Sequence, residues 1–235
     1  MRKFRIVIRV AAVLCLVVGM AVFAYPRITQ WIYNNQVQDM VKNFEADLAT
    51  MKAGAEPDKL DELYELLRRE NTRLYEEGQS ELKDPFSYAQ PGIDLSDYGI
   101  EDNIIGYLVV PRLEETLPIY LGANEDALKL GAAHLTETSY PVGGENTNSV
   151  IAAHRGYYKA NMCRNSQKLG LEDPVYVRNF HETLMYRVAE IKVIQPEDIS
   201  EVLIQQDREL LTLISCHPYG QNAKRYVVYC ERVYS

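Results

Sequence analysis

The stretch Leu210–Arg232, LLTLISCHPYGQNAKRYVVYCER, contains two β-like runs separated by a turn. The first run is apolar over Leu210–Ile214 and ends at Cys216, and the second run begins at Arg225. The residues PYGQN at 218–222 between them are typical of a turn. Two sequential strands with so short a connection are usually antiparallel neighbours, so we expect Cys216 to lie beside Arg225.

An arginine beside a cysteine suits thiolate chemistry. A nearby guanidinium favours the thiolate of Cys216 and can donate hydrogen bonds to the oxyanion that forms when the thiolate attacks a carbonyl. Cys15 lies in an apolar N-terminal run, which leaves Cys163, Cys216 and Cys230 in the rest of the chain. Three is an odd number, so at least one thiol is either free or paired with another chain. A free thiol is either a nucleophile or a buried, inert group.

Thiolate attack on a peptide also needs a proton donor for the leaving amine, and histidine is the natural donor at neutral pH. The chain has four histidines, His134, His154, His181 and His217. His217 follows Cys216 directly, and consecutive strand residues point to opposite faces, so His217 is a poor partner. His181 lies in a polar turn. His154 ends an apolar run as Cys216 does, so we prefer His154, with His134 as the second choice.

Outward from this stretch, the second half of the chain consists of short β-like runs interrupted by turn residues. Strands are expected at 104–110, 116–121, 149–154, 175–178, 183–194, 210–216 and 225–233, with one more near 132–135. Short helical insertions are expected at 125–130, around 160–169 and at 197–203. Many short strands with few helices indicate a mainly β domain over residues 101–235, either a closed barrel or a sandwich.

Two amphipathic helices are expected over residues 28–78, before the β-rich part. Apolar residues recur at helical spacing over 28–51 and again over 60–74, with a break at 54–57. These apolar stripes predict packing against the body of the protein rather than a binding groove. Residues 79–100 follow as a loop rich in glycine and proline, and a loop of this length is typical of a lid or a linker.

Residues 1–27 have the composition of a basic cytoplasmic tail followed by a membrane anchor. Residues 10–25 carry no charge, and Ile6–Ile8 extend this run across Arg9 to about 20 residues, near the length that a bilayer core requires. The basic residues precede the run, so the positive-inside rule predicts a cytoplasmic N-terminus and an extracellular body. A cleaved signal peptide is the alternative, because small residues near the end of the run could form a cleavage site.

The net charge of −8 conceals an asymmetry along the chain. Residues 1–27 contain five basic residues and no acidic one, so residues 28–235 hold 20 basic and 33 acidic residues. A body with a balance of −13 would repel a phosphate backbone, which argues against nucleic-acid binding. The hydrophobic fraction of 47% and charged fraction of 25% are those of a folded globular protein and exclude a disordered chain.

Three motifs in this order resemble those of the sortases, which are membrane-anchored cysteine transpeptidases of Gram-positive bacteria. Residues TLISC at 212–216 resemble the family's TLxTC motif, AHRG at 153–156 its histidine motif, and Arg225 its later arginine. The resemblance covers roughly residues 101–233 and implies an eight-stranded closed β-barrel. It also implies that Cys216 is the nucleophile, His154 the general acid and base, and Arg225 the group that stabilises the oxyanion and positions the substrate.

The tripeptide Asp84-Pro85-Phe86 resembles the lid motif of class C, pilus-assembling sortases, in which an aspartate and an aromatic residue cover the active site. In such a lid, Asp84 would ion-pair with Arg225 and Phe86 would cover the sulfur of Cys216. The helical segment before the loop and the sequence CHPYGQN after it also resemble that class. Many class C sortases carry a second membrane helix after the barrel, and this sequence departs from them there.

The resemblance implies a single-pass membrane enzyme with its catalytic domain on the extracellular face of a Gram-positive bacterium. Its reaction would cleave an LPxTG-like sorting signal of a pilin or surface protein and form a thioacyl enzyme. Transfer to the lysine amine of another pilin would then polymerise pili. No cofactor, no metal and no nucleic-acid partner are expected.

Two rival functions stay open at this point. A sortase of another class would attach surface proteins to peptidoglycan, and a non-enzymatic surface protein would use its barrel only to bind a partner. A metal site is the least favoured interpretation, since His154, Cys216 and His217 lack the paired spacing of structural zinc ligands. No acidic cluster identifies a calcium site.

Overall fold

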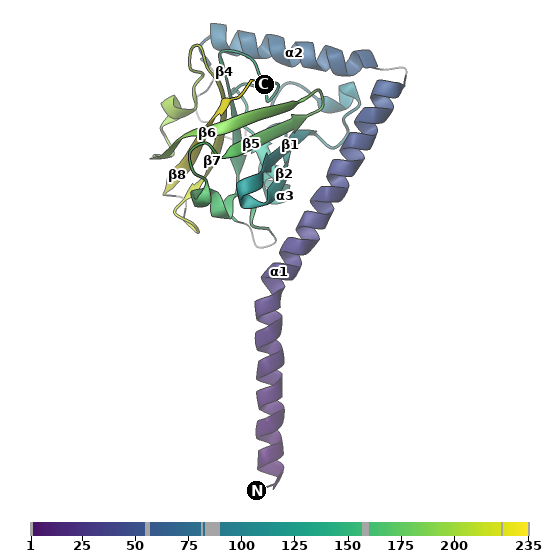
Figure 1. Ribbon diagram of the computed structural model, residues 1–235, viewed down its shortest axis with the longest axis vertical. Coiled ribbons are helices and arrows are strands. Elements are labelled where there is room, and N and C mark those ends of the chain that lie inside the picture. The colour runs from purple at the N-terminus through teal and green to yellow at the C-terminus, as the bar shows by residue number, and fades with distance from the viewer. Residues whose placement is uncertain are drawn as a thin grey trace.

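Eight strands close into a barrel in the computed structural model, which describes residues 2–54, 57–80, 82, 90–156, 160–221 and 223–234. The strands are β1 (Ile104–Val110), β2 (Glu115–Tyr120), β3 (Ala132–His134), β4 (Thr147–Ala153), β5 (Pro174–Asn179), β6 (Thr183–Ile194), β7 (Glu209–His217) and β8 (Lys224–Arg232). Their order around the barrel is β1-β2-β3-β4-β7-β8-β6-β5, and β5 pairs with β1 to close it (Figure 1). The prediction of a closed eight-stranded barrel is confirmed, and the sandwich alternative is wrong.

Strands β4 and β7 are buried over almost their whole length. Every residue of β4 is buried, and β7 is buried from Glu209 to Ser215. The apolar second half of β4 and the apolar residues of β7 agree with this burial, and the buried Thr212 of β7 donates a hydrogen bond to Asn148 Oδ1 of β4. Strand β7 pairs in parallel with β4 and in antiparallel with β8. The three predicted strand ends at 154, 216 and 233 agree with the observed ends to within one residue.

Short helices occupy several connections between the strands. Helix α3 (Glu125–Leu130) lies where a helix is predicted, and the side chain of Asn124 caps its N-terminus. The 3₁₀ helices are η1 (Leu95–Tyr98), η2 (Pro111–Leu113), η3 (Met162–Lys168) and η4 (Ile199–Val202). Residues 160–169 and 197–203, predicted as helical, therefore hold 3₁₀ rather than α-helix. In η3 two residues have non-helical backbone angles, which interrupts the α-helical hydrogen-bond pattern.

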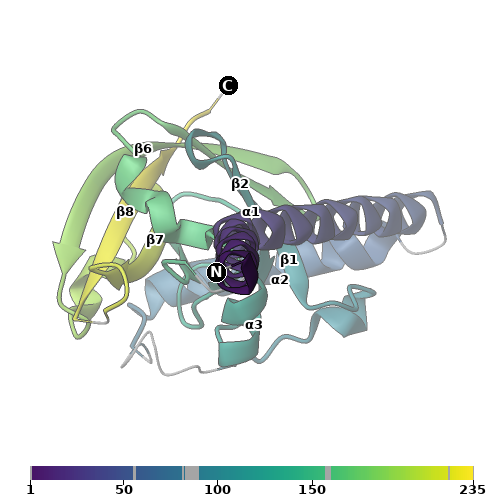
Figure 2. The ribbon, with the colours of Figure 1, turned by 90° about the horizontal axis from the view of Figure 1, so that it is seen from below.

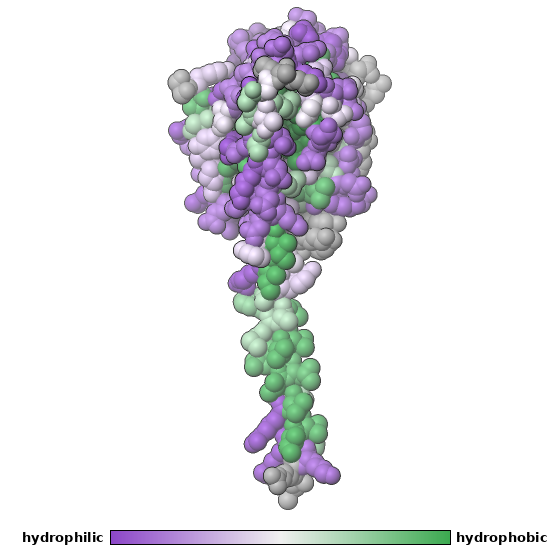
Figure 3. Space-filling model, turned by 90° about the vertical axis from the view of Figure 1, so that its right-hand side faces the viewer, coloured by the Kyte–Doolittle hydropathy of each residue, from purple (hydrophilic) through white to green (hydrophobic). Residues whose placement is uncertain are grey.

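One continuous helix, α1 (Arg2–Ala53), extends from the N-terminus to beyond the barrel (Figure 1). Its most apolar 18-residue window has a mean hydropathy of 2.8, and none of that window is buried. The helix is thus long and apolar enough to span a membrane, by length and composition. Figure 3 shows this part as a hydrophobic column below a mostly hydrophilic body. Pro26 lies inside the helix, so the boundary expected after residue 27 falls within a continuous element.

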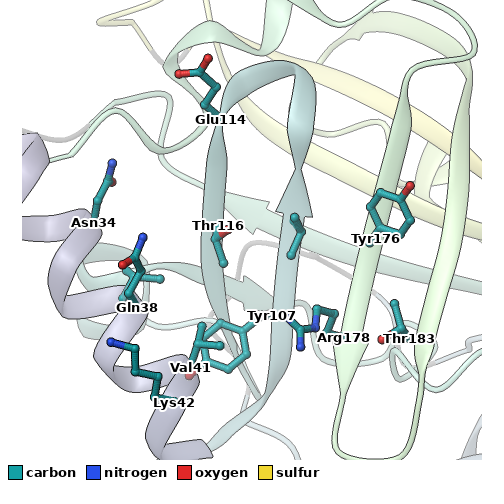
Figure 4. A pocket seen from close by; sticks show the side chains of 12 residues that line it. Asn34, Gln38, Val41, Lys42, Tyr107, Glu114, Thr116, Tyr176, Arg178 and Thr183 are labelled. Carbon is teal, nitrogen blue, oxygen red and sulfur yellow. The ribbon is translucent and has the colours of Figure 1, made fainter. Parts of the chain in front are cut away.

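The second half of α1 packs on the barrel wall that contains β1 and β2. Tyr33 donates a hydrogen bond to the carbonyl oxygen of Leu130 at 3.0 Å. Phe44 meets Tyr107 edge-on, with ring centroids 5.4 Å apart. A groove of about 510 Å³ lies between this half of the helix and strands β1, β2 and β5 (Figure 4). The apolar residues of the predicted stripe before Tyr33 are exposed instead of packed.

Helix α2 (Pro57–Glu76) covers the end of the barrel that is remote from the N-terminus. It lies across the top of the body in Figure 1, and it lies behind the barrel in the view from below in Figure 2. Leu60, Leu63 and Leu67 are buried, as the spacing of the stripe predicts. Asn71 donates to the carbonyl oxygen of Tyr140 and accepts from its N–H. Helix α2 therefore closes one end of the barrel and leaves the opposite end for the site.

Candidate active site

Three neighbouring strand ends bring His154, Cys216 and Arg225 together, and we call these three residues the active-site row. In the parallel β4–β7 pair, Ala152 lies opposite Ile214, so His154 and Cys216 each lie two residues beyond a matched pair. In the antiparallel β7–β8 pair, Cys216 lies directly opposite Arg225. Adjacent strands are about 4.8 Å apart, so the three residues follow one another across β4, β7 and β8.

The active-site row lines a pocket of about 160 Å³. The other lining residues are small or apolar, namely Ala123, Leu128, Leu135, Ala152, Ala153, Ile214 and Ser215. Leu128 belongs to α3, so this helix forms one wall of the pocket. An apolar wall beside three polar side chains excludes water and strengthens the electrostatic interactions among them. The sequence predicts α3 but gives no sign that it covers this pocket.

His154 is half-buried beside charged residues of α3. Burial lowers the pKa of His154, Glu125 acts in the opposite direction, and Lys129 lowers it further. The neutral imidazole is therefore favoured at neutral pH, and a neutral ring can accept a proton. The carbonyl oxygen of His154 accepts a hydrogen bond from the N–H of Cys163 at 3.1 Å, which ties this strand end to η3.

Cys216 is the half-buried thiol that lines the pocket. All four cysteines lie in the described part of the chain, and all four are free thiols. Cys163 and Cys230 are buried. Burial raises the pKa of the Cys163 thiol to about 12 and also raises the pKa of Cys230, so both remain protonated. Since Cys15 lies in the apolar part of α1, Cys216 is the barrel thiol that a substrate can reach.

The other three histidines lie outside the lining of this pocket. His134 is fully buried, its Nε2 lies 3.0 Å from the carbonyl oxygen of Ser139, and burial lowers the pKa of the ring to about 4. His181 stacks on Tyr64 with ring centroids 3.9 Å apart. His217 ends β7, and strand alternation turns it to the face opposite Cys216, as predicted. The second choice, His134, therefore has a structural role.

The predicted lid residues Asp84-Pro85-Phe86 lie outside the described residues. The later part of the 79–100 loop reaches the rim of the pocket, where Gln90 Nε2 donates to the carbonyl oxygen of Ala123 at 3.0 Å. Gly122 has a φ of +80°, and a Cβ at this position would lie 2.5 Å from Cδ of Pro91. Only glycine fits so close a backbone contact, so the loop is anchored one residue away from the pocket lining.

Among the residues that the structure describes, no group of three or more histidine, cysteine, aspartate or glutamate side chains could hold a metal ion. The chemistry available in the pocket is that of a thiol, an imidazole and a guanidinium. On a closed β-barrel, these three groups at the ends of three neighbouring strands define a cysteine-dependent acyl transferase.

Comparison with known proteins agrees with this class. The sortase domain family matches residues 108–233, more than half of the chain. Among solved structures, Streptococcus pneumoniae sortase C is 32% identical, with a TM-score of 0.73 over 84% of this chain and 97% of that chain. Streptococcus agalactiae sortase C1 is 29% identical, with a TM-score of 0.72 over 83% of this chain and 94% of that one. This chain belongs to the sortase family, whose members are cysteine transpeptidases.

Curated relatives that carry the names of other sortase classes match a smaller part of this chain. Sortase D of Bacillus subtilis is 29% identical over 131 residues, which are 54% of this chain. The matched stretch spans 63% of the length of that protein. The class within the family is therefore a separate question from the family itself.

Proposed function

We propose that this chain is a membrane-anchored cysteine transpeptidase that joins an LPxTG-like sorting signal to a pilin lysine and so polymerises pili. The observation that carries the proposal is the active-site row, in which Cys216 lies between His154 and Arg225 along one pocket. A nucleophile, a proton carrier and an oxyanion donor are the groups that acyl transfer needs.

In the first step, the proton of the Cys216 thiol passes to His154, and the thiolate attacks the threonine carbonyl carbon of the sorting signal. A C–S bond forms, and the carbonyl oxygen becomes an oxyanion to which Arg225 donates hydrogen bonds. The C–N bond then breaks, and His154 gives its proton to the departing amine. The products are a thioester on Cys216 and a neutral His154.

In the second step, the amine of a pilin lysine attacks the thioester. An isolated lysine has a pKa of about 10.4, so the amine must lose a proton before it can attack. Neutral His154 takes this proton, and the lowered pKa of His154 agrees with such a state. The C–S bond breaks, an isopeptide bond forms, the leaving sulfur of Cys216 takes its proton back from His154, and the second proton of the lysine ammonium passes to water. Water competes for the thioester, and a covered pocket limits that loss.

The pilin acceptor is supported by likeness to pilus sortases. Streptococcus pneumoniae sortase C is described in terms of its pilin substrate specificity, and sortase C1 of group B Streptococcus belongs to pilus island 1. The likeness to the pneumococcal protein covers more of this chain than the barrel alone, so it includes helical residues before the barrel. These helices are part of what this chain has in common with pilus sortases.

A second candidate function is attachment of surface proteins to peptidoglycan. It is supported by the similarity of this chain to sortase D of Bacillus subtilis and sortase A of Bacillus anthracis, whose names carry no mention of pili. A purely binding role is disfavoured, because a half-buried free thiol lines the pocket beside an imidazole and a guanidinium.

The proposed location is the membrane of a Gram-positive bacterium, with the N-terminus in the cytoplasm and the barrel outside. The basic residues before the apolar run support this orientation. Tyr33 contacts Leu130, and Gln30 accepts a hydrogen bond from the N–H of Asn161. Gln30 and Tyr33 lie no more than about 12 Å along the helix axis from Tyr25, the residue at which the apolar run ends. The barrel would therefore work close to the membrane surface.

We also propose that Asp84 and Phe86 form a lid over Cys216. A lid agrees with the anchoring of the loop at Ala123 and with a crystal structure of a lid mutant of Streptococcus agalactiae sortase C1. In the double variant Asp84→Ala/Phe86→Ala, Cys216 is expected to react several-fold faster with a methanethiosulfonate reagent. The rate of labelling at Cys216 is measured by peptide mass mapping. Ser87→Ala is the matched control. Equal labelling rates in the double variant and the wild type would remove the lid.

The proposed function is tested by incubating the full chain, in detergent micelles, with a sorting-signal peptide and a lysine-containing pilin. Tandem mass spectrometry is expected to find an isopeptide bond between the signal threonine and one lysine. A threonine joined to a peptidoglycan-type amine in preference to lysine would favour the second candidate function. Failure to release the C-terminal fragment of any sorting signal would contradict both.

A further inference from the structure

The residues that follow the members of the active-site row form a second group of contacting side chains. These residues are Arg155 after His154, His217 after Cys216, and Tyr226 after Arg225. His217 and Tyr226 are strand residues, so they point to the face opposite Cys216 and Arg225, and Arg155, two residues beyond the end of β4, contacts both of them. We call Arg155, His217 and Tyr226 the support cluster.

Contacts join the support cluster into one unit. Arg155 Nη1 lies 2.5 Å from His217 Nδ1, and the Arg155 guanidinium lies 5.2 Å from the ring centroid of Tyr226. The His217 ring stacks on Tyr226 with centroids 5.8 Å apart. Arg155 Nη2 donates to Gln167 Oε1 of η3 at 2.5 Å. Arg155 is only 7% exposed, so its bonds form largely out of water and its position is well defined.

A second contact links the same two chain segments. Gly156 has a φ of +85°, and a Cβ there would lie 2.9 Å from Arg164 Nε and 3.0 Å from Cε2 of Tyr219. Arg164 in turn donates to the hydroxyl oxygen of Tyr219. The segment after His154 is thus packed against the segment after Cys216 at two consecutive residues.

The bond between Arg155 and His217 fixes the protonation state of His217. Arginine has donors and no acceptor, so His217 Nδ1 must accept, and the ring is neutral with its proton on Nε2. Lys224 and Tyr226 of β8 are the other titratable groups beside the ring. Burial lowers the pKa of His217, and the positive charges of Arg155 and Lys224 lower it further. An imidazolium could not accept from Arg155 and would be repelled by it.

We propose that His217 is a positioning residue whose neutral ring, held by Arg155, keeps Cys216 and His154 in register for acyl transfer. The proposal rests on the proposed catalytic roles of those two residues. Because His217 and Cys216 are adjacent in β7, as Arg155 and His154 are at the end of β4, loss of the bond lets the two strand ends move apart. A misplacement of about 1 Å between reacting groups can cost about 100-fold in rate. When the pH falls through the lowered pKa of His217, the bond is lost and turnover falls with it.

The test compares His217→Asn with His217→Ala in the full chain, using His181→Ala as the matched control. Asparagine Oδ1 lies three bonds from Cα, as Nδ1 does, and accepts a hydrogen bond without titrating. We expect His217→Asn to keep the kcat of the wild type at pH 8 and to lose one acidic limb of the pH profile. His217→Ala is expected to lower kcat by at least tenfold at pH 8 with a smaller change in KM. His181→Ala removes an exposed histidine that stacks on Tyr64 and does not line the pocket, so it should behave as the wild type.

The proposal is overturned if His217→Asn loses as much kcat as His217→Ala, or if all variants share the pH profile of the wild type. A readout that needs no substrate separates this result from a failure of the proposed function. In ¹⁵N spectra of histidine-labelled protein, the His217 signals, identified by their absence in His217→Asn, should show protonated Nε2 and bare Nδ1 at pH 7. A ring protonated on Nδ1 would contradict the proposal even if no substrate were processed.

Discussion

Cys216→Ala is expected to reduce release of the C-terminal fragment of a sorting peptide to the background rate. Cys216 is the free thiol that lines the pocket. Where several catalytic residues act together, removal of the nucleophile lowers kcat by a factor on the order of 10⁶. Fragment release is measured with a quenched fluorescent peptide and the full chain in micelles.

Cys163→Ala and Cys230→Ala are the matched controls for this loss. Both thiols are buried and protonated, so their replacement is expected to leave kcat within a few-fold of the wild type. Circular dichroism checks that all three variants are folded. Activity that survives in Cys216→Ala, or that disappears in folded Cys163→Ala, would show that the nucleophile has been assigned to the wrong thiol.

Arg225→Ala is expected to lower kcat by about 10²–10³, the cost of removing one oxyanion donor. Arg225 lies opposite Cys216 in the β7–β8 pair, where its guanidinium can reach an oxygen on the carbon that the sulfur attacks. Arg225→Lys keeps the charge but replaces the planar fork with a single ammonium, so it should recover only part of the rate. Initial rates at saturating peptide separate this effect from changes in KM.

Lys224→Ala is the matched control for Arg225. Lys224 is the preceding residue of β8, is exposed and lies opposite His217 rather than Cys216. Its removal at pH 8 is expected to leave kcat within a few-fold of the wild type. An equal loss in Lys224→Ala and Arg225→Ala would mean that positive charge near the strand end matters, and not a hydrogen bond from Arg225.

The active-site row could be predicted from the sequence because strand ends mark it. The apolar run of β4 is followed by His154, and the apolar run of β7 is followed within two residues by Cys216. The turn before Arg225 is short enough to imply a hairpin. The parallel pairing of β4 with β7 could not be predicted from local sequence patterns. It joins segments separated by two other strands, and it sets His154 level with Cys216.

Other parts of the site depend on tertiary packing and could not be predicted. Helix α3 has a clear cap at Asn124, yet nothing in its sequence indicates that Leu128 lines the pocket. Its position in the sequence predicts that His217 points away from Cys216, but its bond to Arg155 requires two distant chain segments to meet. The segment boundary expected after Arg27 lies inside a continuous helix, because Pro26 is accommodated within α1.

The central claim is that Cys216 carries a thioester during turnover. The most direct measurement is intact-mass and peptide-mapping mass spectrometry of the full chain, quenched in acid shortly after mixing with a sorting peptide in the absence of an amine acceptor. We predict an added mass equal to the N-terminal peptide fragment, located on Cys216 and released by hydroxylamine or by an added lysine peptide. Peptide cleavage that proceeds with no adduct on Cys216, or with an adduct on another residue, would contradict the claim.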